Sequence, residues 1–217
     1  MRDHQNPPSD EKSWDEFYRS HDALWSGNAN PQLVNEISSL PPRTALDAGC
    51  GEGGDAIWLA QKGWQVTGMD FAETALLRAA DNATRADPEL ANRITWMQAD
   101  LTTWQPNRQF DLVTSHFMHL PTKLREPVFA ALAAAVAPGG TLLIVGHHPS
   151  DMHAAIGRPD LPDWYFTAED IADTLDPDLW RILVAESRNR TFTRDDEEFD
   201  IADTVLRAHR TAAAELV

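Results

Sequence analysis

The chain has 217 residues, with 34 acidic against 18 basic side chains, a formal net charge of −16 and an isoelectric point near 4.7. This length fits one domain with a substantial core, and the acidic balance disfavours nucleic acid and anionic membranes as partners, since both carry negative charge. The single cysteine rules out an internal disulfide and fits a reducing compartment; because we recognise neither a secretory leader nor a long apolar run, we expect a cytoplasmic protein.

The first forty residues predict a short helical segment. Ser13 and Glu16 have the spacing of a capping box, which would open a first helix. Asn30 and Pro31 predict a second helix start, with asparagine as the cap and proline in the first helical position. This second helix is expected to run to about Leu40, where two prolines follow.

From residue 44 onward, apolar strand-like runs alternate with helical patterns. Strands are expected at 44–48, 64–69, 94–99, 110–115 and 141–146, and helices at 55–61, 73–86 and 124–137. Gly63 suits the left-handed cap after one of these helices, and Pro127 is expected within the first turn of another. The alternation predicts an α/β fold, a three-layer, doubly wound arrangement with a mostly parallel sheet between helices.

The last third of the chain departs from this alternation. Residues 148–166 are rich in proline, histidine and aspartate and show no regular period, and a loop of this length is uncommon unless it is functional. A helix is expected at 167–175, with Thr167 and Asp170 as its capping pair. Two strand-like runs joined by an acidic turn predict a closing antiparallel pair, at 181–192 and 199–209.

A glycine-rich turn lies between the first strand and its helix. Glycines in this place let a ligand approach the backbone closely, next to a helix N-terminus. Gly49, Gly51 and Gly54 also satisfy the dinucleotide-binding pattern G-x-G-x-x-G, and Asp70 stands where a ribose-binding acid is expected. The glycines alone therefore leave the cofactor ambiguous.

Asp47, two residues before the first of these glycines, favours a cationic ligand. A carboxylate here would repel a pyrophosphate, whereas it would attract the ammonium and sulfonium groups of S-adenosylmethionine. The structural alternative is that Asp47 only caps the turn.

Two further acids support an adenosine site. Asp70, at the end of the second strand, can accept hydrogen bonds from both ribose hydroxyls. Asp100, at the end of the third strand, is placed to accept from the adenine amino group, and Leu101 beside it would cover the adenine face. Each acid alone is more often a turn residue, but together they stand at successive strand ends on one sheet edge.

With these residues the chain resembles the class I S-adenosylmethionine-dependent methyltransferase superfamily, including small-molecule members related to tellurite-resistance and thiopurine methyltransferases. The resemblance covers about residues 30–147 and rests on the segments 46–53, 66–70, 98–101, 110–113 and 137–142. It implies a seven-stranded sheet with an antiparallel last strand, in a single domain (1–217). The expected parts are a helical lid (1–40), a cofactor-binding core (44–147) and an acceptor-side loop (148–166).

The resemblance also implies S-adenosylmethionine as methyl donor and a small molecule as acceptor, with a thiol or other soft nucleophile as the first candidate. The expected cofactor contacts are Asp47, Gly49, Cys50, Gly51, Asp70, Phe71, Asp100, Leu101, Ser115 and Trp25. Trp25 belongs to the lid segment, where an aromatic face beside a sulfonium would gain cation–π energy. The alternative is that these lid aromatics are core residues of an extra helix.

Histidines follow the fourth and fifth strands, where they would face the ligand crevice. His116, His119 and His148 are the candidate catalytic residues, because an imidazole can act as a general base near neutral pH. A divalent metal is an alternative, held by His116 and His119 with help from the 148–153 segment. We do not predict a metal, because this pattern of histidines is only a weak signal for a metal site.

Two other functions stay open from the residues alone. A nicotinamide-dependent oxidoreductase would use the same glycines, but Asp47 argues against it. A binding module that holds S-adenosylmethionine without catalysis would look the same, because methyl transfer depends mainly on positioning. The acceptor pocket is expected over the carboxyl ends of the fourth and fifth strands.

Overall fold

The computed structural model describes residues 10–21, 24–118, 120–153, 160–194 and 197–212. The strands are β1 (Thr44–Ala48), β2 (Gln65–Asp70), β3 (Ile94–Gln98), β4 (Phe110–His116), β5 (Val136–His147), β6 (Trp180–Arg194) and β7 (Glu197–Arg210). The helices are α1 (Glu11–Arg19), α2 (Pro31–Ile37), α3 (Gly54–Gln61), α4 (Glu73–Ala86), α5 (Pro88–Ala91), α6 (Thr122–Ala134) and α7 (Ala168–Ala172), with short 3₁₀ turns at Pro149–His153 and Pro162–Trp164.

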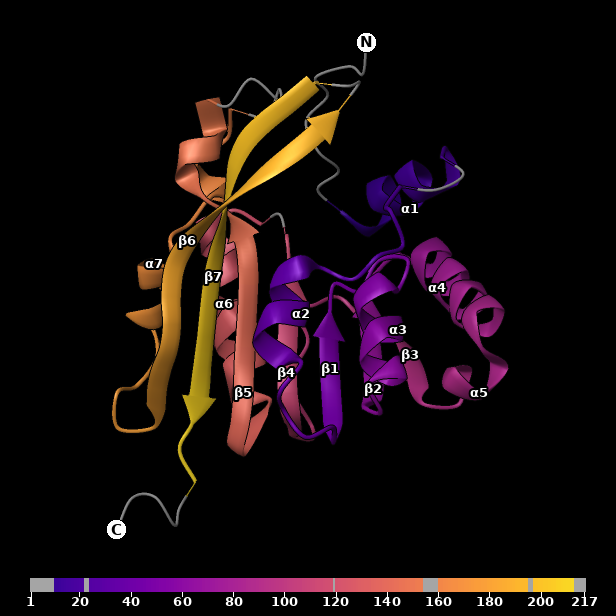
Figure 1. Cartoon of the computed structure of the whole chain (residues 1–217), viewed down its shortest axis with the longest axis horizontal. Coiled ribbons are helices and arrows are strands. Elements are labelled where there is room, and N and C mark those ends of the chain that lie inside the picture. The colour runs from indigo at the N-terminus through magenta and orange to yellow at the C-terminus, as the bar shows by residue number, and fades with distance from the viewer. Residues whose placement is uncertain (1–9, 22–23, 119, 154–159, 195–196, 213–217) are drawn as a thin grey trace.

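One seven-stranded sheet organises the molecule, in the order β3-β2-β1-β4-β5-β7-β6 (Figure 1). The first five strands are parallel, whereas β7 is antiparallel to both of its neighbours. The predicted α/β fold with an antiparallel last strand is therefore confirmed. Because β1 to β5 are parallel, their carboxyl ends meet at one edge of the sheet, where ligands bind in folds of this kind.

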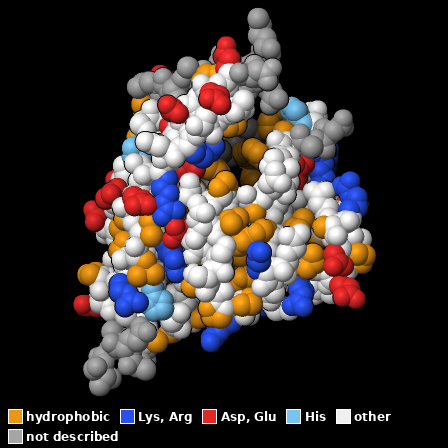
Figure 2. Space-filling model, viewed as in Figure 1, with side chains coloured by type: hydrophobic (Ala, Val, Ile, Leu, Met, Phe, Trp, Pro, Cys, Tyr) orange, Lys and Arg blue, Asp and Glu red, His pale blue; other side chains and the backbone are white. Residues whose placement is uncertain are grey.

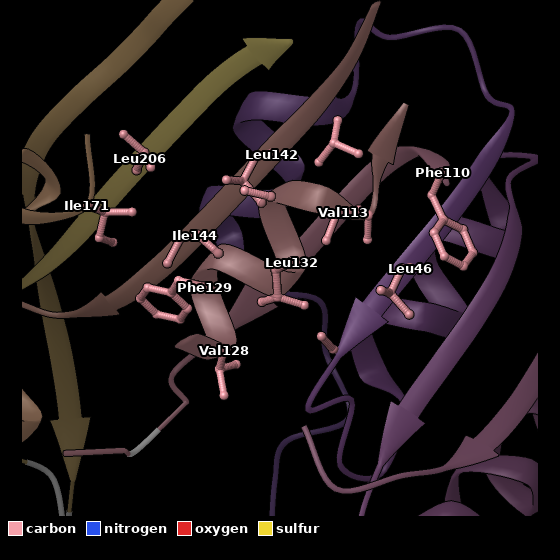
Figure 3. Packing of buried hydrophobic residues seen from close by; sticks show 14 of the residues in the cluster. Leu46, Phe110, Val113, Val128, Phe129, Leu132, Leu142, Ile144, Ile171 and Leu206 are labelled. Carbon is pink, nitrogen blue, oxygen red and sulfur yellow. The ribbon is translucent and has the colours of Figure 1, made fainter. Parts of the chain in front are cut away.

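Helices cover both faces of the sheet, because successive side chains of each strand point to opposite faces. Ala45 and Leu112 pack with α2 and α3 on one face. Leu46 and Val113 pack with α6 and α7 on the other, where Phe129 of α6 is part of the larger cluster (Figure 3). The two clusters fix the strands beneath the loops that form the site. No helix among the described residues is long and apolar enough to span a bilayer.

Two expectations for the N-terminal helices are wrong in detail. The capping box of α1 is formed by Asp10 and Ser13, so Ser13 is the third helical residue and not the cap. The Asp10 carboxylate accepts the Ser13 N–H at 2.8 Å, and a negative charge at this position also favours the helix dipole. The helix α2 starts at the predicted Asn30 cap but ends at Ile37, since the backbone turns before the prolines.

The α6–β5 boundary also differs from expectation. The helix α6 begins at Thr122 and ends at Ala134, so Pro127 is its sixth residue and lies beyond the first turn. The strand β5 starts already at Val136, opposite Phe110, and its register with β4 shifts before Thr141. Gly139, at a φ of 81°, lies in this irregular stretch, which explains why only the regular part from Thr141 reads as a strand in the sequence.

The β6–β7 hairpin is confirmed and is longer than predicted. The strand β7 pairs with β5 only as far as the Asp203–His147 position, whereas its pairing with β6 continues to Glu197 and Arg194. The outer part of the hairpin, which we call the hairpin overhang (189–194 and 197–202), therefore projects beyond the sheet at its ligand-binding edge (Figure 1).

Candidate functional site

A pocket of about 390 Å³ opens at the carboxyl edge of the sheet. Figure 2 shows a hollow in the upper part of the view, with hydrophobic side chains inside it. Its walls come from the N-terminal segment, from the turns after β1 to β4, and from the inner end of the hairpin overhang. The predicted site residues that line it are Trp25, Gly49, Cys50, Gly51, Asp70, Phe71, Asp100, Leu101 and His116.

The glycine-rich turn forms one wall of the pocket, with backbone conformations that favour glycine. Gly49 and Gly51 have φ angles of 75° and 52°, in the left-handed region. A Cβ atom on Gly51 would lie 3.0 Å from the Tyr18 hydroxyl and 3.3 Å from Trp25 Nε1. The turn is held against β2 by the N–H groups of Gly49 and Cys50, which both donate to the Met69 carbonyl. A flat backbone surface is thereby exposed beneath the aromatic side chains.

Asp70 is fixed at the end of β2 by two backbone donors. Its Oδ2 accepts from the Gly51 N–H at 2.9 Å, and its Oδ1 accepts from the Ala72 N–H at 3.0 Å. Burial raises the pKa of this carboxyl above its usual value, against the opposing effect of these hydrogen bonds. Each carboxylate oxygen keeps a second lone pair for a ligand in the pocket.

Asp100 stands two residues beyond the end of β3, and one of its oxygens serves the turn. Its Oδ1 accepts from both the N–H and the hydroxyl of Thr102, at 2.8 and 2.7 Å. Asp100 and Leu101 nevertheless both line the pocket, on the same side as Asp70. The structural and the ligand-binding interpretations of Asp100 are therefore compatible.

Asp47 lies beneath the glycine-rich turn rather than on the lining of the pocket. It is 2% exposed, and within the described part of the chain its Oδ2 has no hydrogen-bond partner. Burial, with the neighbouring Asp55 carboxylate as the next cause, raises the pKa of Asp47 to about 7. Its expected contact with a ligand ammonium stays a prediction, which the unpartnered oxygen supports.

His116 pairs with Asp55, a residue that has no role in the expectations from the sequence. The Nδ1–H of His116 donates to Asp55 Oδ2 at 2.7 Å, and Nε2 lies 2.8 Å from the Thr114 hydroxyl. Burial alone would lower the pKa of His116, but the Asp55 carboxylate outweighs it and the pKa is raised. Both ring nitrogens of His116 have partners inside the protein. This geometry therefore favours a role as the charge partner of Asp47 and Asp55, and it disfavours a role as the base that deprotonates a substrate.

The other histidines predicted as catalytic are not found beside His116 among the described residues of the pocket lining. His148 lies outside the pocket lining, and its Nδ1 is bonded to the Ser150 hydroxyl at 2.9 Å. His119 and the side chain of His153 fall outside the described residues. Ser115, also predicted as a cofactor contact, is buried in β4 away from the lining.

One set of possible metal-binding side chains is found in the described ranges, and it differs from the expected set. It consists of Asp47, Asp55 and His116, whose donor atoms lie within 4.8 Å of one another. The hydrogen bond between Asp55 and His116 already accounts for this proximity.

The N-terminal segment is tied to the glycine-rich turn by Glu52. Its Oε2 accepts from the N–H groups of Leu24 and Trp25, at 3.1 and 3.2 Å. Its Oε1 accepts from Arg78 of α4 at 2.9 Å, and Arg78 also donates to the His21 carbonyl. Glu52 belongs to the motif by position, but its role follows only from the tertiary structure.

The far end of the pocket is formed by residues that the sequence analysis missed. Phe117, after β4, has a φ of 51°, and among the described residues no other non-glycine has a positive φ. Such strain is typical of functional sites. Arg190 of β6 and Asp203 of β7 complete this wall with Met118. One signal was present in the sequence: Asp203 interrupts an otherwise apolar run of β7.

Sequence comparisons agree with this geometry. A family model described as a methyltransferase domain matches residues 45–140. Thiocyanate methyltransferase 1 of Brassica oleracea is 30% identical over 147 residues, which cover 65% of this chain and 64% of that protein. The 2-heptyl-1-hydroxyquinolin-4(1H)-one methyltransferase of Mycobacteroides abscessus is 30% identical over 162 residues, which cover 68% of this chain and 70% of the relative.

Solved structures share the fold. The N-methyltransferase NodS of Bradyrhizobium japonicum, in complex with S-adenosyl-L-homocysteine, superposes with a TM-score of 0.67 at 19% identity, covering 93% of this chain and 99% of that one. A structure from echinomycin biosynthesis reaches 0.72 at 23% identity, over 94% and 92% of the two chains. The relatives, the glycine-rich turn and the sheet together show that this chain belongs to the class I S-adenosylmethionine-dependent methyltransferases.

Proposed function

We propose that the protein transfers the methyl group of S-adenosylmethionine to a small-molecule acceptor, and that a thiol or other soft nucleophile is the first candidate for this acceptor. The observation that carries the proposal is a single pocket with two chemically different ends. One end has a glycine-rich turn and two carboxylates at successive strand ends, and the other has an apolar wall with one ion pair.

The residues of the first end fit S-adenosylmethionine. Asp70 would accept from the ribose hydroxyls, while Leu101 and Phe71 would flank the adenine. The backbone of the glycine-rich turn leaves the space that the methionine portion needs, and the unpartnered Asp47 oxygen beneath it suits an ammonium. When bound, S-adenosylmethionine supplies an electrophilic methyl group on a sulfonium sulfur.

The lid belongs to the same proposal. Tyr18 and Trp25 line the pocket and are joined by a hydrogen bond of 3.2 Å between Trp25 Nε1 and the Tyr18 hydroxyl. Their rings would cover the cofactor and exclude water from the reacting atoms. The part of the chain up to residue 40 would then act as a lid in a single cytoplasmic domain.

A soft acceptor is supported by the wall opposite the cofactor and by the relatives. Phe117, Met118 and Leu120 present apolar and polarisable surface at the end of β4, which suits a sulfur nucleophile better than a strongly hydrated one. Besides the thiocyanate methyltransferase, a probable thiol methyltransferase of Arabidopsis thaliana is 28% identical over 135 residues.

A hydroxylated aromatic heterocycle is the second candidate. It is favoured by the hydroxyquinolinone methyltransferase relative, whose alignment spans more of both chains than that of the thiocyanate enzyme. The rings of Trp25 and Phe117 in the pocket lining would stack on such an acceptor.

The proposal is tested by measuring the release of S-adenosylhomocysteine in the presence of thiols, thiocyanate, hydroxyquinolinones and amines. We expect turnover with at least one of the first three classes and binding of S-adenosylmethionine in calorimetry. Binding of NAD without any response to S-adenosylmethionine or S-adenosylhomocysteine would contradict the proposal. Binding of both adenosyl ligands without turnover on any acceptor would instead indicate a protein that binds S-adenosylmethionine without catalysing methyl transfer.

A further inference from the structure

The acceptor end of the pocket contains a buried ion pair that the shared motifs do not include. Arg190 of β6 donates through Nε to Asp203 Oδ2 of β7 at 2.8 Å. Both residues line the pocket, and the Asp203 side chain is 1% exposed. A buried ion pair on a ligand-facing wall is costly in desolvation unless its remaining atoms find partners.

The second donor to Asp203 is fixed by a chain of polar contacts. Arg188 bonds to Glu36 of α2 at 2.6 Å and donates to Gln32 Oε1 at 3.0 Å. Because the oxygen of the Gln32 amide is occupied by Arg188, its Nε2 must point to Asp203 Oδ2, which it reaches at 3.2 Å. The Asp203 carboxylate is therefore held in one orientation by Arg190 from one side and Gln32 from the other.

This orientation leaves the other carboxylate oxygen unused. Asp203 Oδ1 is buried and has no hydrogen-bond partner among the residues that the structure describes. A buried acceptor without a donor costs about 1–3 kcal/mol. Since the residue lines the pocket, a donor group of a bound acceptor could fill this place.

The sheet order places this oxygen on the acceptor side. The strand ends that carry Asp70 and Asp100 lie on one side of β1, whereas β4, β5 and β7 follow on the other side. An adenosine held over β2 and β3 directs the reactive end of the cofactor toward β4 and beyond. Asp203 stands opposite His147 at the end of β5, with Phe117 and Met118 of the same wall nearby in the lining.

We propose that Asp203 is the base that accepts the proton of the methyl acceptor, so that the substrate class is a protonated nucleophile, a thiol or an aromatic hydroxyl, rather than a proton-free anion such as thiocyanate. This inference rests on the proposed methyl transfer. Among the described residues, the charged or titratable groups that face Asp203 are Arg188 and Arg190 from β6, His116 from β4 and His147 from β5; Gln32 from α2 is neutral.

The step balances without a further reactant. A lone pair of the acceptor sulfur or oxygen forms the new bond to the methyl carbon, and the bond from this carbon to the sulfonium sulfur breaks with its electron pair remaining on that sulfur. The acceptor proton passes to Asp203 Oδ1 and leaves to solvent after the products depart. His116 is not available for this task, because Asp55 and Thr114 occupy both of its ring nitrogens.

The test compares Asp203→Asn with wild type on two kinds of acceptor: an aryl thiol and a hydroxyquinolinone, which carry a proton, and thiocyanate and iodide, which carry none. We expect kcat/KM for the protonated acceptors to fall by about 10²–10³-fold, the range typical of a lost general base. The loss for the proton-free anions should stay below about tenfold, because only the shape of the wall changes. Asp200→Asn, an exposed residue of the same strand, is the matched control and should leave both rates unchanged.

A second measurement does not depend on how the variant folds. Wild-type enzyme is assayed at neutral pH on a series of aryl and alkyl thiols of rising pKa. With a base, the rate constant changes little along the series. Without one, it falls by about threefold for each unit of thiol pKa above the assay pH, because the thiolate becomes tenfold rarer while its nucleophilicity rises by about threefold.

The outcomes separate this inference from the proposed function. An equal loss on both kinds of acceptor, an unchanged rate of Asp203→Asn on thiols, or wild-type turnover restricted to proton-free anions would each overturn the role of Asp203 while leaving methyl transfer intact. Absence of turnover by wild type on every acceptor overturns the proposed function itself. Calorimetric binding of S-adenosylhomocysteine shows whether the variant is folded.

Discussion

The two ends of the pocket are built in different ways. The cofactor end comes from the turns after three neighbouring strands, each close in sequence to the strand that positions it. The acceptor end joins the residues after β4 to Arg190 and Asp203, which are more than seventy positions further along the chain. Under the proposed function, a local motif specifies what is bound at one end, whereas long-range strand pairing specifies what reacts at the other.

The largest effect is expected from Asp70→Ala, which should damage the cofactor end alone. It releases the Gly51 N–H and, under the proposed function, removes two charge-assisted hydrogen bonds to the ribose, so we expect about 2–4 kcal/mol of lost affinity for S-adenosylmethionine. Titration calorimetry measures this loss. Asp70→Asn should lose less, because one oxygen remains as an acceptor. An unchanged dissociation constant for Asp70→Ala would show that the ribose lies elsewhere.

A smaller effect is expected from Gly51→Ala. The new Cβ must adopt a left-handed backbone and push against the Tyr18 hydroxyl, so cofactor affinity should fall by roughly tenfold or more. Gly139→Ala is the control, since Gly139 has a similar φ of 81° but lies away from the pocket. It should lower the unfolding temperature without changing the affinity. Equal affinity losses in both variants would mean that Gly51 matters for stability only.

Asp47→Asn should separate stability from binding. The pKa of Asp47 is about 7 in the folded protein, above its ordinary value of 3.8. The contribution of protonated Asp47 to the unfolding free energy is therefore fully present below pH 3.8 and is lost as the pH rises through about 7. The raised pKa of His116 acts in the same direction above its ordinary value of 6.5. The ligand-free Asn variant should therefore gain on the order of 1–2 kcal/mol in unfolding free energy at pH 8 relative to pH 5, compared with wild type.

Chemical denaturation at the two pH values measures this gain, with Asp200→Asn as an exposed control. Affinity for S-adenosylmethionine should fall at the same time, because the partner of the ammonium is lost. A variant that gains no stability at pH 8 would show that Asp47 is not strained by its burial.

The smallest effect is expected from Glu52→Gln, which loosens the contact between the N-terminal segment and the glycine-rich turn. The neutral amide keeps the shape but weakens the bond to Arg78, which is worth about 1 kcal/mol when partly buried. We expect KM for S-adenosylmethionine to rise a few-fold while kcat changes less. Lys12→Gln, which breaks only an exposed contact to Glu16, should have no effect. A large loss of kcat with normal KM would place Glu52 in the reaction itself.

The elements around the glycine-rich turn could be predicted because their information is local. The strands β1 to β3 are marked by apolar runs, and the turn is marked by glycines, which favour left-handed backbone conformations. The boundaries of helices and strands were predicted less accurately. For α1, the Asp10 cap competes with a similar pattern that starts at Ser13. For β5, the shifted register with β4 makes the residues before Thr141 look like a turn in the sequence.

The sequence predicts a pocket at the sheet edge where the structure has one, but it does not predict the residues at the far end of that pocket. The sequence indicated histidines after β4 and β5, yet His148 points its ring nitrogen to Ser150 and His116 is engaged with Asp55. Asp203 and Arg190 become neighbours only through the β6–β7 register, in which each strand continues beyond β5. Periodicity shows that a strand exists, but it does not show how far its partner extends.

The hairpin overhang has a consequence for how the enzyme can change over evolutionary time. Apart from Ala202, which is hydrogen-bonded to His148 and Asp151, its strands pair with each other and with no third strand of the described chain, and an isolated two-stranded ribbon is marginally stable in water. Amide hydrogens of residues 189–194 should therefore exchange with solvent faster than those of β1 or β4, by local opening that leaves the cofactor end intact. Insertions and substitutions in such a ribbon cost the rest of the fold little. Under the proposed function, this wall is therefore where new acceptor preferences can arise while the methyl donor stays the same.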